Sequence, residues 1–129
     1  MAIRRIVKEG DPILRMKCRP VTEFGEKLNQ LLDDMHETLE QANGVGLAAP
    51  QVGYCRRFFI MHLGDVKIEA INPEIKKTSG KQYVLEGCLS VPNKWGYVTR
   101  PNKCKFRAQN RTSLLTHQGN VECLITVCF

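Results

Sequence analysis

The sequence predicts an α+β fold in which antiparallel sheets surround one helix. Two observations predict it. Apolar residues recur every three or four positions between Thr22 and Asn43, which is the period of an amphipathic helix. Between Arg57 and Ala108, short apolar or alternating runs are separated by Gly, Pro, Asn and Ser, which is typical of consecutive antiparallel strands. One helix followed by strands, without a repeating strand–helix unit, belongs to the α+β class.

Capping and turn residues delimit the helical elements. Asp11 followed by Pro12 predicts a short helical turn, because aspartate is a favoured N-cap and proline suits the first helical position. We expect the long helix to begin at Thr22 and to end at Asn43. His36 lies on the flank of its apolar stripe among acidic residues, so we expect a solvated side chain rather than a ligand.

Turn residues also separate the expected strands. Gly64 and Asp65 predict a tight hairpin turn, and His62, on the first strand of that hairpin, is expected to be structural or exposed. Asn72 and Pro73 are expected to end the hairpin. The expected strands span residues 57–63, 66–71, 82–85, 95–99 and 103–108. We expect the last two to be half-buried.

Length and composition suit one soluble globular domain, because the chain has 129 residues, 43% of them hydrophobic and 25% charged. The net charge of +6 is compatible with an anionic partner such as RNA or a ribosome surface. The basic residues, however, occur as scattered pairs with few aromatic residues among them. We therefore expect no dedicated nucleic-acid face and no specific nucleic-acid partner.

The six cysteines form no C-x-x-C pair of the kind found in zinc knuckles and redox motifs. The N-terminal residues lack the apolar core of an export signal, and no apolar run approaches the length of a membrane span. These features predict reduced thiols in a cytoplasmic protein that does not enter a membrane.

Two glycine-containing runs stand out as candidates for one wall of an active site. Residues 44–53 read GVGLAAPQVG, and residues 86–92 read EGCLSVP. Packing alone predicts that Cys88 is a buried small hydrophobe. A packed strand gives no reason, however, to enclose Cys88 so closely between glycine and proline, and this pattern favours a chemical role.

These two runs, in this order, resemble the first two signature motifs of the peptide deformylase family. The likeness covers approximately residues 1–110, including the opening residues 3–7 and the strand at 95–98. The resemblance implies a deformylase-like α+β fold. It also implies the family's reaction, which is metal-dependent hydrolysis of the N-formyl group from the terminal methionine of newly made polypeptides.

The resemblance assigns chemical roles to three residues. Cys88 matches the cysteine that, with two histidines, holds a divalent metal in this family, usually Fe²⁺, with Zn²⁺ or Ni²⁺ as substitutes. Such a metal lowers the pKa of bound water from about 15.7 to about 7. Gln51 and the backbone N–H of Leu89 match the donors that stabilise the oxyanion. A glutamine that only caps its loop is the structural alternative for Gln51.

The resemblance also implies a site for the formyl-methionyl peptide. Glycines allow a peptide backbone to approach and to pair as an added strand. The residues matched to the substrate and to the pocket for its methionine side chain are Gly44, Val45, Gly46, Val84, Glu86 and Gly87.

The third family motif, a helix with His-Glu-x-x-His, is missing from this chain. The only histidine after Cys88 is His117, which is followed by Gln118, and Val121 occupies the place of the second histidine. A catalytic metal site normally has three protein ligands and an open position. We therefore expect impaired activity and a fold without the metal-binding helix.

The last nineteen residues differ in character from the rest. Only Arg111 and Glu122 are charged there, so we expect a deformylase-like domain over residues 1–110 and an atypical tail over 111–129. Our hypothesis is a truncated or frame-shifted C-terminus. Residues 123–129 have the composition of either a covering strand or an aggregation-prone segment.

Two other functions remain open from the sequence. One is a non-catalytic remnant that binds formyl-methionyl peptides without metal. The other is an unstable fragment without activity, because losing a covering helix removes a large share of the stability of a domain.

Overall fold

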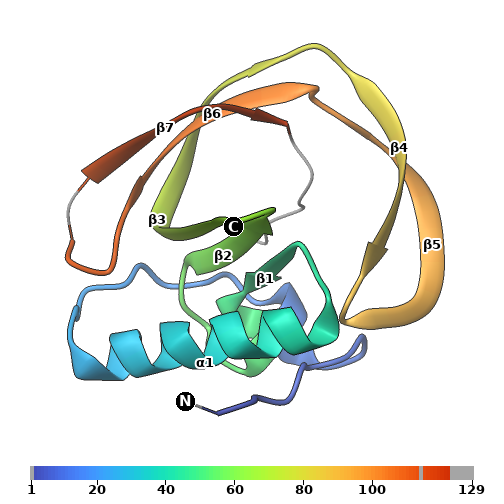
Figure 1. The fold of residues 1–129 in the computed structure, drawn as a ribbon. Helices are drawn as coiled ribbons and strands as arrows, with labels where there is room; N and C mark the ends of the chain where they lie inside the picture. Colours follow the sequence, from blue (N-terminus) through green and yellow to red (C-terminus); the bar gives the residue numbers. More distant parts are fainter. Residues whose placement is uncertain (1, 114, 123–129) are drawn as a thin grey trace.

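A computed structural model describes residues 2–113 and 115–122 (Figure 1). Its elements in chain order are a 3-10 helix (Pro12–Arg15), α1 (Glu26–Ala42), β1 (Gly46–Ala48), a second 3-10 helix (Ala49–Val52), β2 (Phe58–Leu63), β3 (Val66–Ser79), β4 (Gln82–Cys88), β5 (Val91–Arg100), β6 (Lys103–Gln109) and β7 (Leu115–Glu122). Among these elements, no helix is long and apolar enough to cross a membrane. The tail segment 123–129 lies outside the described residues.

The strands form two antiparallel sheets, which confirms the α+β prediction. Five strands are ordered β1-β2-β3-β6-β7, and β4 pairs with β5 in a separate two-stranded sheet. The expected hairpin is present, with Leu63 opposite Val66 across the Gly64-Asp65 turn. The expected helical turn is also present, and the Asp11 side chain accepts a hydrogen bond from the N–H of Ile13 at its start.

The strand β3 continues past the point where the sequence predicted a break. Its pairing with β2 ends at Ile71, opposite Phe58, and its pairing with β6 begins at the same residue, opposite Gln109, with a register shift between Ile71 and Glu74. Asn72 has a φ of 52° there, and Pro73 has no N–H to donate. The expected break is therefore wrong as the end of a strand, because these two residues instead mark a change of partner.

Asn72 also holds the segment before α1, which begins at Glu26 and not at Thr22 as the sequence predicted. Its side chain accepts a hydrogen bond from the N–H of Val21 at 2.7 Å and donates one to the Val21 carbonyl at 2.9 Å. This pairing holds the chain just before Thr22 against β3, outside the helix. At the other end the prediction is confirmed, because Asn43 adopts a left-handed conformation, with φ of 54°, and ends the helix.

The main core lies between α1 and one face of the large sheet. Buried α1 residues and alternate residues of β2 form it, and its largest fully buried side chains include Leu32, Met35, Leu39 and Ile60. Phe59 and Met61, the intervening residues of β2, face a second apolar cluster with Phe106 on the opposite side of the sheet. The two-residue period of a strand places neighbouring β2 residues in different clusters.

The N-terminal segment is tied to α1 by the buried carboxylate of Asp34. Its two oxygens accept hydrogen bonds from Ala2 N at 2.8 Å and from Arg4 Nε at 2.9 Å. Burial alone would raise the pKa of Asp34, but these hydrogen bonds, one from Gln30 and the charge of Arg4 lower it below its ordinary value. The start of the chain is thereby fixed along α1 before it reaches the residues described below as the site.

His36 and His62 are joined in one network, so the expectation of a solvated His36 is wrong. Nδ1 of His36 lies 2.8 Å from Nε2 of His62, and Nε2 of His36 lies 2.7 Å from Glu69. The ring centroids are 5.1 Å apart and the planes differ by 4°, so the rings meet edge to edge in one plane. Burial, with the nearby charges of His36 and Lys67, lowers the pKa of His62.

Arg111 completes this network at the beginning of the predicted atypical tail. Its guanidinium donates to Glu69 and, at 2.9 Å, to Asp33 on α1. Burial alone would raise the pKa of Glu69, but the hydrogen bonds and charges of Arg111 and His36 lower it to about 2. The Glu69 partner in turn raises the pKa of Arg111. The network thus connects α1, β3 and the segment between β6 and β7.

The strand β5 is more exposed than the sequence predicted. Trp95 is 69% exposed and Tyr97 is 61% exposed, so the expectation of a half-buried strand is wrong for this element. The strand β6 agrees better, because Phe106 and Ala108 are buried while Lys103 and Lys105 are exposed. The difference arises because β6 lies inside the large sheet, whereas β5 pairs only with β4.

Replacing Leu32 by alanine tests the core. The side chain is fully buried, so the L32A substitution should lower the free energy of unfolding by about 2–5 kcal/mol. Urea denaturation measures this change. The matched control is Lys27→Ala, an exposed position of the same helix, which should change stability by less than about 0.5 kcal/mol. Equal losses in both variants would contradict the described packing.

The pKa of Glu69 predicts a pH dependence of stability. In the folded state this pKa is lowered from 4.5 to about 2, so the stabilisation is present above about pH 4.5 and is lost as pH falls toward 2. Glu69→Gln should therefore flatten the acid side of the stability curve, measured by urea unfolding across this range. The exposed Glu23→Gln serves as control and should leave the curve unchanged.

Candidate active site

Cys88 ends β4, and its side chain is exposed, not buried as packing alone predicted. The carboxamide of Gln51 contacts its sulfur, with Nε2 at 3.8 Å from Sγ. The two glycine-containing runs therefore meet at these two side chains, although they are separated by a complete hairpin and the β3–β4 turn.

The carboxamide of Gln51 is held in one orientation by two hydrogen bonds. Its Oε1 accepts from the N–H of Ala48 at 3.0 Å, and its Nε2 donates to Oγ of Ser90 at 3.1 Å. The first contact is the loop cap that the structural alternative expected. The second leaves the remaining Nε2 hydrogen for the side of Cys88, so capping and donation are compatible in one side chain.

Residues 7–9 connect both runs through their backbone. The N–H of Val7 donates to the Gln51 carbonyl at 2.7 Å, and the N–H of Glu9 donates to the Ser90 carbonyl at 2.7 Å. Between them, Nζ of Lys8 donates to the Leu89 carbonyl at 3.1 Å. Sequence patterns did not indicate these roles for Lys8 and Ser90, because each contact joins segments that are about eighty residues apart.

Leu89 and Gly44 pack directly against each other. A Cβ added to Gly44 would lie 2.8 Å from Cδ1 of Leu89 and 2.7 Å from Cδ1 of Leu39. The partly buried Leu89 side chain also contacts the main core. Gly44 is therefore required for close packing between the two runs, which is a different reason from the approach of a substrate backbone.

The strand β1 lies at the edge of the large sheet, where Gly46 is opposite Met61 of β2. Just before it, the Val45 side chain is 46% exposed, while its carbonyl accepts the N–H of His62. An edge strand beside an exposed apolar side chain is the arrangement in which an extended peptide can pair with a sheet.

Val84 and Glu86 share one partly buried face of β4. Both Glu86 oxygens accept from Arg100 on β5, at 2.6 and 2.8 Å, which fixes the carboxylate in a two-bond contact. Gly87 lies under the ring of Trp95, where an added Cβ would approach ring carbons at 2.9 Å. Glu86 is thus held by a charged partner that the sequence did not predict.

The residues that could hold a metal do not form a site in the described part of the chain. No group of three His, Cys, Asp or Glu side chains suitable for a metal occurs within residues 2–113 and 115–122. His36 and His62 bind each other and Glu69, and His117 lies on β7 opposite Arg107 in backbone register. The donor set around Cys88 therefore does not fit the metal implied by the motifs.

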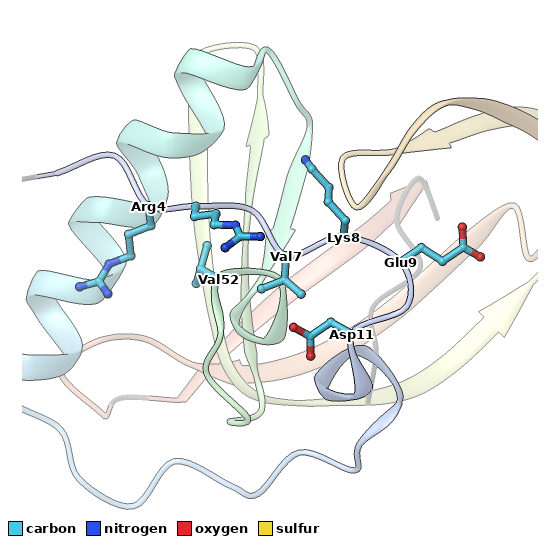
Figure 2. A pocket seen from close by; sticks show the side chains of 7 residues that line it. Arg4, Val7, Lys8, Glu9, Asp11 and Val52 are labelled. Carbon is cyan, nitrogen blue, oxygen red and sulfur yellow. The ribbon is translucent and has the colours of Figure 1, made fainter.

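A pocket of about 550 Å³ lies beside the N-terminal segment, with Arg4, Lys8, Glu9 and Asp11 among its lining residues. Figure 2 shows Lys8, Glu9 and Asp11 pointing in different directions. Gln51, Cys88 and Leu89 do not line this pocket. Because these charged side chains point away from one another, they do not form a second candidate site for a metal or a small ligand.

Comparison with known proteins identifies the family of this chain. The family model for polypeptide deformylase matches residues 3–129. The chain belongs to the polypeptide deformylase family. Peptide deformylase of Agathobacter rectalis is 55% identical over 107 residues, which are 83% of this chain and 68% of that protein. Peptide deformylase of Caldicellulosiruptor bescii is 50% identical over 111 residues, which are 86% of this chain and 67% of that protein.

Solved deformylase structures share the fold. The crystal structure of peptide deformylase from Thermotoga maritima superposes with a TM-score of 0.91 at 38% identity, covering 95% of this chain and 83% of that one. The structure from Legionella pneumophila gives a TM-score of 0.92 at 37% identity, covering 98% and 76%. The predicted deformylase-like fold is confirmed.

Gly44→Ala tests the contact between the two runs. The new methyl group would overlap Leu39 and Leu89, so the free energy of unfolding should fall by about 1–3 kcal/mol and the methyl NMR signals of Leu89 should shift. The control is Gly96→Ala, where an added Cβ has no atom within 4 Å. A G44A variant with unchanged stability and unchanged Leu89 signals would contradict the packing.

Proposed function

We propose that this chain binds N-formyl-methionyl peptides in the deformylase manner and that its hydrolytic turnover is impaired. Members of this family remove the formyl group from newly made polypeptides. The observation that carries the proposal is the Gln51 carboxamide, which is fixed by Ala48 and Ser90 with Nε2 directed toward Cys88. An uncharged hydrogen-bond donor whose position is fixed before the substrate binds can donate to the oxygen of a formyl group.

The polar roles follow from the chain itself. Gln51 Nε2 and the N–H of Leu89 would donate to the formyl carbonyl oxygen, on which negative charge develops during attack by water. Losing one such donor typically costs about 10²- to 10³-fold in rate. Residues 7–9 keep these two donors in register, because they bond to the Gln51, Leu89 and Ser90 carbonyls.

The peptide backbone would pair with the edge strand β1, beside Gly44, Val45 and Gly46. Strand addition uses backbone hydrogen bonds for affinity and side-chain pockets for specificity. Val84, Glu86 and Gly87 would border the methionine side chain, with Glu86 held in place by Arg100.

Family chemistry relies on a divalent metal that activates water, and we propose Fe²⁺ as the natural ion, with Zn²⁺ or Ni²⁺ as substitutes. Cys88 would supply one ligand. Because the described donors do not complete a site, metal retention by this chain is expected to be weak. We further propose a cytoplasmic location, where nascent peptides are supplied at the ribosome surface.

A turnover assay with a formyl-Met-Ala dipeptide tests the impaired hydrolysis. Purified chain supplemented with Fe²⁺, Ni²⁺ or Zn²⁺ should release no more formate than the metal alone, and metal analysis should find less than one ion per chain. Formate release above that background would show that the missing ligands are supplied and would overturn the impairment.

Calorimetric titration with the same dipeptide tests binding. Gln51→Glu keeps an acceptor for Ala48 but removes the donor, so affinity should fall about 5- to 10-fold. The exposed Gln41→Ala is the matched control and should bind like the unaltered chain. A cooperative thermal unfolding transition in both variants would count against the interpretation of the chain as an unstable fragment. If Gln51→Glu and Gln41→Ala bound the dipeptide equally well, the role assigned to Gln51 would be wrong.

A further inference from the structure

Positive charge is concentrated in one part of the fold. Residues 74–107 contain eight Lys or Arg and two Glu, a net charge of +6, which equals the net charge of the whole chain. The rest of the chain is therefore neutral overall. This region comprises the outer part of β3, all of β4 and β5, and most of β6.

These strands form one long bent ribbon. Ser79 is opposite Lys103 at the end of the β3–β6 pair, and Gln82 is opposite Arg100 at the start of the β4–β5 pair. The two pairs are therefore aligned without a register shift across Gly80, because the partners are three positions apart on each strand. An added Cβ at Gly80 would lie 2.9 Å from Asn102, so the strands stay in contact there. Figure 1 shows the segment from β3 to β4 running beside the segment from β5 to β6 through the bend.

Alternate residues place lysines and aromatic side chains along one face of this ribbon. Lys77 is opposite Lys105, and Leu85 is opposite Tyr97. The stacking face, as we name this surface, consists of Lys77, Lys81, Lys105, Tyr83, Leu85, Trp95 and Tyr97, all of which are exposed. Lys103 lies on the same face, opposite Glu122 in backbone register, and is not included in this definition.

The three lysines of the stacking face make no ion pair within the described residues 2–113 and 115–122. Like charges directly opposite each other, as at Lys77 and Lys105, are unfavourable for a sheet. An anionic partner bound between them would relieve that repulsion, which makes the face complementary to a polyanion.

The aromatic half of the stacking face is unusually open. Tyr83 and Trp95 are each 69% exposed, Tyr97 is 61% exposed, and the Tyr83 and Tyr97 rings stack with centroids 5.1 Å apart. Exposed aromatic rings next to cations are the combination with which proteins hold single-stranded nucleic acid, because every base has a π-face and every nucleotide a phosphate.

We propose that the stacking face binds single-stranded RNA, with phosphates on Lys77, Lys81 and Lys105 and bases on the Tyr and Trp rings. From Lys77 to Leu85 the ribbon is about 26 Å long at a rise of about 3.3 Å per residue, which is room for several nucleotides. RNA is the occupant to which the proposal commits, because the exposed rings and the lysines of one face match the bases and the phosphates of a single strand. The proposal does not depend on peptide turnover.

The test is a titration of the full chain with a fluorescein-labelled uridine oligonucleotide, followed by fluorescence anisotropy. With three phosphate contacts, log Kobs should fall against log salt with a slope of about −2. Trp95 is the only tryptophan, so its fluorescence should be quenched as a base stacks on the ribbon. Absence of binding at low salt would overturn the proposal.

Two double variants separate the two halves of the face. Tyr83→Ser with Tyr97→Ser should weaken binding about fivefold or more and leave the salt slope unchanged. Lys77→Ser with Lys105→Ser should reduce the slope to about −0.7. The charge-matched control is Lys17→Ser with Lys27→Ser, exposed positions outside the ribbon, which should bind like the unaltered chain. Cooperative thermal unfolding confirms that each variant is folded.

If the stacking face binds something other than single-stranded RNA, the measurements differ, and each of the following outcomes would overturn the proposal. An equal affinity for dextran sulfate without Trp95 quenching would indicate a general polyanion surface. A dimer in sedimentation that the tyrosine variants abolish and RNA does not dissociate would assign the face to a second copy of this chain. Tighter binding of a DNA oligonucleotide of matched length and base composition would exclude RNA as the preferred ligand.

Discussion

The site depends on hydrogen bonds that hold two distant runs of sequence together. Gln51 bonds to Ala48 within its own loop and to Ser90 beside Cys88. The N-terminal segment adds backbone bonds to the Gln51 and Ser90 carbonyls. Because three parts of the chain meet there, the direction of the carboxamide is fixed before any ligand binds. Preorganised donors of this kind are the ones that contribute to recognition and to catalysis.

The long ribbon gives the protein two surfaces of different character. Its partly buried face carries Val84 and Glu86, which the site uses, with Arg100 fixing the carboxylate. Its outer face carries lysines and exposed aromatic rings, including Trp95. Period-two alternation makes this possible, because neighbouring residues of one strand serve opposite sides. Substitutions at Val84 or Glu86 therefore leave the side chains of the outer face in place, whereas Gly87 lies under the Trp95 ring and borders both surfaces.

Predictions from the sequence succeeded where the cause is local. The Asp11 cap, the Gly64-Asp65 turn and the end of α1 at Asn43 all follow from backbone preferences of single residues. They failed where a distant partner decides. Thr22 does not begin the helix, and the neighbouring Val21 is held by Asn72, a contact that no pattern near Thr22 could reveal.

The sequence by itself determined the family, the α+β class and the residue types of the site, because motif order and hydrophobic period are properties of the chain alone. Only the tertiary structure decided that Cys88 is exposed beside Gln51, that His36 is bound to His62 and Glu69, and that lysines and aromatic rings share one face. Those facts depend on which segments pack across from each other. Such contacts are set by strand register and burial over the whole fold, and no local pattern records them.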